Sequence, residues 1–427
     1  MSDKAKPLST ESYKGVRDFY PEDLFIQNYI FSIWKEVVEK FGYEEYSASI
    51  LESSELYKAK SGEEIVNEQT YTFTDRGDRE VTLRPEMTPT VSRMVAGKVH
   101  DLSFPLRWYS IPNLFRYEKP QRGRLREHWQ LNVDLFGVDG NKADIEIINI
   151  AYRIMKRFGA KDEDFIIRFN DRRLMRQLYE KFEMSEENSY KASKIIDKKD
   201  KISSDAFKTS FEEILGGKTD EFITLIESHE KLLDFLGESE LTNEIITTIE
   251  ELLELGVNNI AFDPTLMRGF DYYTGMVFEV FDTDPENNRS VFGGGRYDEL
   301  MDIFGVKKIP TVGFGAGDVT AKDFLEKHDL LPTYRPQTHL YVCTIGSEFT
   351  NHALDMADEL RDLGVNVAVD LTDKKLGDQI KIADKQKIPY IICIGEDEVK
   401  TGVYTLKNME TREEKKVKLE EVASNLI

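Results

Sequence analysis

The sequence contains few of the residues that mark secreted, membrane-bound or metal-binding proteins. Among its 427 residues only Cys343 and Cys393 are cysteines, each inside an apolar run typical of a strand, so a disulfide framework is excluded. The six histidines lack the spacing of metal ligands, and we expect no metal site. No apolar run approaches the ~20 residues of a membrane-spanning helix, and the segment MSDKAKPLSTES has no secretory-signal pattern. We expect a cytoplasmic protein without membrane contact.

Two common nucleotide-binding motifs are missing as well. The sequence has no GxxxxGK[ST], which excludes a Walker-type NTPase. The segment GFGAG at 313–317 has GxGxG spacing rather than GxGxxG, and no acidic residue about 20 positions later ends a second strand. A dinucleotide-binding oxidoreductase is therefore disfavoured.

The charge of the chain is unevenly distributed. Its 57 basic and 79 acidic residues give a formal net charge of −22, which as an average argues against a nucleic-acid partner. Residues 211–260, however, hold 13 acidic and 2 basic side chains, whereas residues 105–126 hold six basic side chains and one acid. This local basic segment keeps an anionic or nucleic-acid partner open.

The hydrophobic pattern predicts two domains. An amphipathic helix fits residues 23–41, strand-like runs follow to about 137, and helical periodicity dominates 142–262 before strands return. After a linker, strands and helices alternate. We predict an α+β domain at 1–330, built on an antiparallel sheet and interrupted by a helical insertion at about 171–262, and a small α/β domain with parallel strands at 335–427.

The basic segment lies in a predicted hairpin. LRWYSIPNLFRYEK and EHWQLNVDLFGV indicate two antiparallel strands joined by PQRGRLR. Because alternate residues of a strand share a face, polar side chains line one face of the second strand, namely His128, Gln130, Asn132 and Asp134. This face is either a solvated surface or a binding site. The charged segment TLRPEMT, just upstream, favours a site.

At these residues the sequence resembles a known family. TLRPEMT, FRYEKPQRGRLREHWQLNVD, RGFDYYTGMVFE and GGRYD resemble, in order and spacing, the signature segments of histidyl-tRNA synthetases, which are class II aminoacyl-tRNA synthetases. The resemblance extends over nearly the whole chain. The resemblance implies a class II catalytic domain followed by an anticodon-binding domain. The segment RGFDYYTG is the most specific part of the resemblance.

The resemblance implies a function and a set of site residues. The reaction would be the ATP-dependent activation of histidine and its transfer to tRNA(His), with Mg²⁺ bound. Catalysis would come from alignment of the reactants and from cations placed where negative charge develops on the phosphate. Two arginines would be catalytic and also hold the histidine, Arg116 and Arg268. Further histidine-binding residues would be Glu86, Met87, Thr88, Gln130, Asp134, Tyr272, Tyr273 and Tyr297. ATP-binding residues would be Arg116, Glu118, Arg124, Arg126 and His128. Contacts to tRNA would come from Gln121, Arg122, Lys374 and Lys375.

Some of these interpretations have alternatives. If Tyr272 and Tyr273 lie in one strand, they face opposite sides and one belongs to the core. The glycines at 293–295 serve either a turn or close ligand approach. The resemblance also implies a homodimer, formed through the N-terminal helix and the following strand.

The sequence departs from the family at one phosphate-binding position. Class II enzymes usually carry an arginine in the helix after the GxGxG-like strand, where it holds the γ-phosphate of ATP, but here Thr320 stands in its place. Either another cation compensates, or the chain is a paralogue without adenylation activity. Such paralogues serve as histidine-sensing regulatory subunits of ATP phosphoribosyltransferase and typically lack the anticodon domain.

Overall fold

The computed structural model describes residues 8–58, 69–119, 123–199, 202–267, 272–287 and 289–426. Three of the expected site residues, Gln121, Arg122 and Arg268, lie outside this part of the chain. The chain divides into two compact units, of which the second contains Pro332–Ile427 together with Tyr20–Phe25. Within the described ranges no helix is both long and apolar enough to span a membrane.

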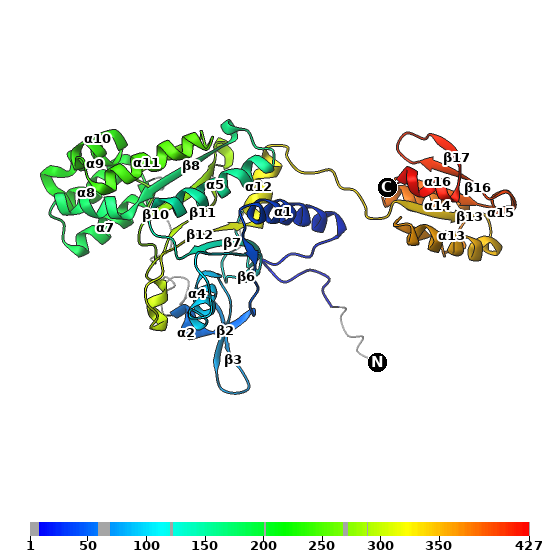
Figure 1. Cartoon of the computed structure of the whole chain (residues 1–427), viewed down its shortest axis with the longest axis horizontal. Coiled ribbons are helices and arrows are strands. Elements are labelled where there is room, and N and C mark those ends of the chain that lie inside the picture. Colours follow the sequence, from blue (N-terminus) through cyan, green and yellow to red (C-terminus); the bar gives the residue numbers. More distant parts are fainter. Residues whose placement is uncertain are drawn as a thin grey trace, which may run out of the picture. The chain divides into compact units, whose positions relative to one another are not determined.

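The first unit is built around one large sheet (Figure 1). In spatial order its strands are β1 (Glu44–Glu45), β5 (Leu106–Ser110), β7 (Glu127–Phe136), β12 (Thr311–Gly317), β11 (Ser290–Arg296), β10 (Met276–Asp282), β8 (Phe165–Asp171) and β9 (Ile260–Phe262), and β6 (Asn113–Phe115) also pairs with β7. Pairing is antiparallel from β5 to β8, and the end strands β1 and β9 join in parallel. The predicted antiparallel sheet is confirmed.

Three amphipathic helices cover this sheet. They are α1 (Pro21–Lys40), α5 (Asn141–Arg157) and α12 (Asp318–Lys327), and their apolar faces share one hydrophobic core with the strands. Helix α12 contacts both β7 and β11, so its first turn lies beside the strand that carries the polar face. A separate three-stranded antiparallel sheet has the order β2 (Leu51–Ser53), β4 (Glu80–Leu83), β3 (Tyr71–Thr74). The helices in this part of the chain are α2 (Ser54–Lys58) and α4 (Thr88–Gly97).

A group of helices lies between β8 and β9 in the chain. It comprises α6 (Arg172–Lys181), α7 (Glu186–Ile196), α8 (Ser204–Leu215), α9 (Thr219–Ile226), α10 (His229–Leu236) and α11 (Glu240–Glu254). Serines accept hydrogen bonds from backbone N–H groups at the starts of α7, α8, α10 and α11, as N-caps do. Buried phenylalanines, including Phe182, Phe211 and Phe222, join these helices. The acidic residues thus lie on helices whose buried side chains belong to the same hydrophobic core as the large sheet.

The second unit has a five-stranded sheet in the order β14 (Val367–Val369), β13 (Leu340–Thr344), β15 (Tyr390–Ile394), β16 (Val403–Asn408), β17 (Glu414–Lys418). The first three strands are parallel, as predicted, and the last two are antiparallel. Its helices are α13 (Thr350–Asp362), α14 (Leu376–Lys385), α15 (Glu396–Thr401) and α16 (Leu419–Leu426). Strands β16 and β17 were not predicted from the sequence, and β17, EKKVK, is almost entirely polar and exposed.

Candidate active site

The site is built on the hairpin of β6 and β7. Asn113 pairs with Trp129 and Phe115 with Glu127, and the Arg116 N–H donates to the Arg126 carbonyl at 2.9 Å, which continues the ladder. The Arg116 Nε donates to the carbonyl of Pro85 at 2.9 Å. The hairpin therefore holds the Arg116 guanidinium beside the segment that carries Glu86.

The polar face of β7 is buried rather than solvated. Asn132 and Asp134 are both at most 5% exposed. The neighbouring strand β12 has glycine at alternate positions, and a Cβ on Gly313 or Gly315 would overlap with the side chains of Asp134 and Gln130. These glycines leave room for polar side chains inside the sheet, so the interpretation as a solvated surface is wrong.

Tyrosines and carboxylates meet in this buried space. The Tyr272 hydroxyl donates to Glu86 Oε2 at 3.0 Å, and the Tyr297 hydroxyl donates to Asp134 Oδ1. The ring centroids of Tyr272 and Tyr273 are 5.1 Å apart, and that of Tyr297 is 5.9 Å from Tyr272. Tyr272 and Tyr273 precede β10, so strand alternation does not separate them. The condition for placing one of them in the core, that both lie in one strand, is therefore not met.

Two acceptor atoms in this space have no hydrogen-bond partner among the described residues. They are Asp134 Oδ2 and Gln130 Oε1, both buried. Burial raises the pKa of Asp134 to about 7, although the hydrogen bond from Tyr297 acts in the opposite direction. Buried acceptors without donors are costly, and they suit a ligand that brings its own N–H groups.

The basic turn places its arginines in different environments. Arg124 is exposed and lies 3.5 Å from the Glu118 carboxylate. Arg126 is buried, and its guanidinium donates to the Glu118 carbonyl at 3.2 Å and lies 4.1 Å from the Tyr117 ring centroid. These contacts use much of its donor capacity within the protein. Burial, and then the charges of Arg116 and Arg17, lower the pKa of His128 to about 3, so its imidazole is neutral.

The remaining expected residues have less specific surroundings. Met87 is buried directly before α4, and Thr88 is the first residue of that helix. The glycines at 293–295 lie within β11, which rules out the turn. Lys374 and Lys375 are exposed and directly precede α14 in the second unit. Within the described ranges, no group of three or more histidines, cysteines or carboxylates could hold a metal ion.

Two residues at this site were not predicted from the sequence, Arg17 and Asp318. Asp318 begins α12 and is buried, and Arg17 Nη2 lies 2.7 Å from its Oδ2. The sequence offered one signal for Asp318, which is an aspartate directly after the apolar strand GFGAG. A carboxylate buried at that position requires a cation or a hydrogen-bond donor as partner. The partner itself is separated from Asp318 by 301 positions.

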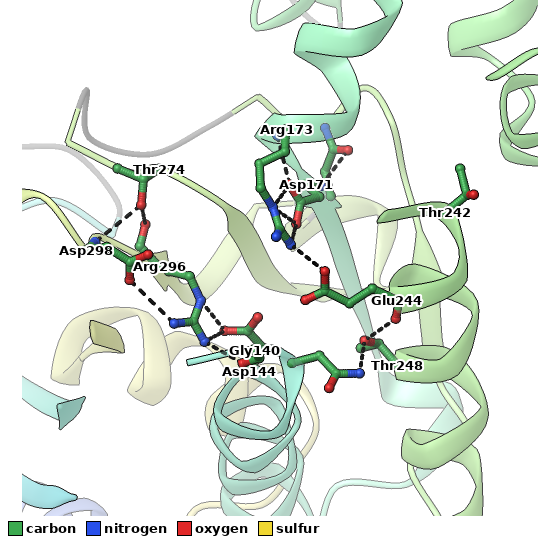
Figure 2. A network of polar contacts seen from close by, with 12 residues as sticks. Gly140, Asp144, Asp171, Arg173, Thr242, Glu244, Thr248, Thr274, Arg296 and Asp298 are labelled. Carbon is green, nitrogen blue, oxygen red and sulfur yellow. Dashed lines mark hydrogen bonds and ion pairs between the residues drawn. The ribbon is translucent and has the colours of Figure 1, made fainter. Parts of the chain in front are cut away.

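Figure 2 shows a network of polar contacts around Arg296 and Arg173. Arg296, the last residue of β11, binds Asp144 of α5 at 2.7 Å and Asp298 at 3.4 Å, while Arg173 bridges Asp171 and Glu244. A cavity of about 490 Å³ is lined by both arginines and by Tyr272 and Tyr273. Because Tyr297 directly follows Arg296, this network fixes the end of β11 from which Tyr297 projects.

Replacing Arg296 with methionine should destabilise the first unit by about 3–5 kcal/mol, because the buried Asp144 carboxylate would lose its cation. The free energy of unfolding from urea titration measures this effect. The double variant Arg296→Met/Asp144→Leu removes both charges and should recover most of the loss. An equally unstable double variant would contradict the argument, since the cost would then not come from an uncompensated charge.

Known proteins match this chain over nearly its full length. A family model described as histidyl-tRNA synthetase matches residues 15–318, and one described as anticodon binding domain matches residues 339–427. The histidine–tRNA ligase of Leptospira biflexa is 44% identical over 417 residues, which cover 96% of this chain and 95% of that protein. The histidine–tRNA ligase of Thermoplasma volcanium is 36% identical over 422 residues, which cover 96% of this chain and 97% of that protein.

A solved structure agrees with these sequence matches. The crystal structure of histidyl-tRNA synthetase from Nostoc sp. PCC 7120 superposes with a TM-score of 0.84 at 25% identity, covering 98% of this chain and 99% of that one. The resemblance drawn from the signature segments is confirmed: the chain belongs to the histidyl-tRNA synthetase family.

Proposed function

We propose that the protein is a histidine–tRNA ligase, which activates L-histidine with ATP and transfers the histidyl group to the 3′ end of tRNA(His). The observation that carries this proposal is a pair of buried acceptors, Asp134 Oδ2 and Gln130 Oε1, near Glu86 and three tyrosines. Neither acceptor has a hydrogen-bond partner in the part of the chain that the structure describes. An α-ammonium group supplies the missing donors. Membership of the family supports the same substrate.

The pocket suits an amino acid with a polar ring. Hydrogen bonds from the ammonium group would be accepted by Glu86, Thr88, Gln130 and Asp134, and Met87 would lie next to Glu86 and Thr88 in the chain. Tyr272, Tyr273 and Tyr297 would surround the imidazole. A site that hydrogen-bonds a substrate ring rejects analogues without those polar atoms by large factors, which explains tyrosine rather than phenylalanine here.

ATP would bind along the hairpin. In the first step the histidine carboxylate attacks the α-phosphorus and pyrophosphate leaves, so no nucleophile from the protein is required. Arg116 would stabilise the negative charge at the α-phosphate, and Arg268 would be the second cation there. The neutral His128 imidazole would stack on adenine, and Glu118 and Arg124 would contact the nucleotide, which binds as its Mg²⁺ complex. Arg126 would contact the nucleotide as well.

The partners and the cellular location follow from this function. The second unit, at about 335–427, would bind the anticodon stem with Lys374 and Lys375, and Gln121 and Arg122 would approach the acceptor end of tRNA(His). The first domain, at 1–330 with its insertion at 171–262, would catalyse the reaction as part of a homodimer in the cytoplasm.

The alternative is a histidine-sensing regulatory subunit of ATP phosphoribosyltransferase. The match to an anticodon binding domain at 339–427 disfavours it, since such paralogues typically lack that domain. The chain also retains Arg116 and Glu118.

Histidine-dependent exchange of labelled pyrophosphate into ATP tests the proposal. The purified protein should catalyse exchange with histidine and not with phenylalanine or glutamine. Histidine binding without any exchange would refute the ligase and favour the regulatory subunit. Charging of tRNA(His) in a second assay tests the transfer step.

A further inference from the structure

The N-terminus of α12 holds a buried carboxylate with three donors. Asp318 Oδ2 accepts hydrogen bonds from Arg17 Nη2 at 2.7 Å and from Gln27 Nε2 at 3.2 Å, and Oδ1 accepts one from the Trp129 N–H at 3.0 Å. Its exposed fraction is 2%. The negative charge at a helix N-terminus is itself favourable. Asp318 therefore provides a rigid support that fixes Arg17.

The Arg17 guanidinium is connected through Asp318 to the second strand of the hairpin. Asp318, which binds it, also binds the backbone of Trp129, the residue after His128. The positive charges of Arg17 and Arg116 both lower the pKa of His128, so the three side chains share one region. The Arg17 Nε is buried without a hydrogen-bond partner among the described residues, and the side chain is 24% exposed. This cation is fixed in place and retains donor capacity.

Thr320 cannot supply the missing positive charge, and its hydroxyl is already used. Its Oγ1 donates to the Val291 carbonyl at 2.6 Å, and its methyl group lies 3.7 Å from where a Cβ of Gly123 would be. The basic turn therefore lies against this part of α12. Lys322 lies two residues further, about 200° around the helix, and points elsewhere.

We propose that Arg17 binds the terminal phosphates of ATP, in place of an arginine on α12, and that Asp318 is the positioning residue that holds it there. The proposal rests on the proposed function, because it assigns a role within ATP-dependent activation. An arginine fork with one N–H engaged by a carboxylate still offers donors to phosphate oxygens. The alternative is an ion pair that only fastens the segment around Arg17 to α12.

Binding of ATP and of AMP to an Arg17→Gln/Asp318→Asn variant distinguishes these possibilities. This double change removes both charges and leaves no unpaired buried carboxylate. Titration calorimetry should show ATP affinity reduced about tenfold or more, because a charge-assisted contact to the terminal phosphates is lost, while the affinities for AMP and histidine stay within about twofold. The KM for pyrophosphate in the exchange reaction should rise in the same proportion as the KM for ATP.

The matched control is Arg107→Gln/Glu146→Gln, a second partly buried pair in the same unit, with contacts of 2.8 Å. It should leave ATP affinity unchanged. Equal losses of ATP, AMP and histidine affinity in the Arg17 variant, or unchanged ATP affinity, would overturn the role of Arg17. Tighter ATP binding by Thr320→Arg in the otherwise unchanged chain would also overturn it, because the site would then lack a clamp. Absence of exchange by the unchanged protein would instead refute the ligase function.

Discussion

Replacing Arg116 with alanine should lower the rate of histidine-dependent pyrophosphate exchange by about 10²–10³-fold, because a fixed cation at a developing phosphate charge contributes strongly to such steps. Arg116 is held at the end of the hairpin by backbone pairing with Arg126 and by the contact of its Nε with the Pro85 carbonyl at 2.9 Å. Among the described residues the guanidinium makes this one hydrogen bond, so its other N–H groups would be available to the α-phosphate and the histidine carboxylate in the proposed complex.

The control for Arg116→Ala is Arg93→Ala, which removes an exposed arginine paired with Glu52 in the same unit and should leave exchange unchanged. Thermal unfolding of both variants separates a loss of catalysis from a loss of fold. Exchange by Arg116→Ala within about twofold of the unchanged protein would contradict the assignment of this residue.

Local patterns were sufficient to predict the sheet and the strand that carries the site. The alternation of Gln130, Asn132 and Asp134 with apolar residues identified a polar face, and the pairing of β6 with β7 places it as expected. Whether this face is solvated could not be decided locally. It is buried because β12, nearly two hundred positions later in the chain, offers glycines against these side chains.

The residues that the sequence did not predict depend on contacts between distant segments. Arg17 and Asp318 are separated by 301 positions, and neither lies in a pattern that indicates the other. The convergence of Tyr272, Tyr273 and Tyr297 was expected from the family resemblance alone. The strand pattern could not predict it, since Tyr272 and Tyr273 precede the strand to which alternation applies. In both cases the backbone path, rather than residue spacing, determines which side chains meet.

Replacing Asp134 with asparagine should weaken histidine binding by about 10- to 100-fold at pH 8, because the ammonium group loses a charge-assisted acceptor in a buried site. The dissociation constant for histidine from calorimetry measures this loss. The ratio of variant to unchanged protein should shrink as the pH falls through about 7, where the pKa of Asp134 lies and its carboxylate becomes protonated. The imidazole of the bound histidine also titrates in this range, but it affects both proteins equally and therefore cancels in the ratio of the two dissociation constants.

The same substitution should have the opposite effect on stability. The pKa of Asp134 is raised from 3.8 to about 7 by burial, so its ionisation opposes folding: the contribution is absent below pH 4, grows as the pH rises and is complete above 7. Asp134→Asn, which cannot ionise, should therefore be more stable than the unchanged protein at pH 8, by an amount on the order of a few kcal/mol, and nearly equal in stability at pH 4. A variant that loses both histidine affinity and stability at pH 8 would show that Asp134 is needed for the fold. A variant that gains stability and loses histidine affinity would show that the Asp134 carboxylate destabilises the fold but is needed to bind the ligand.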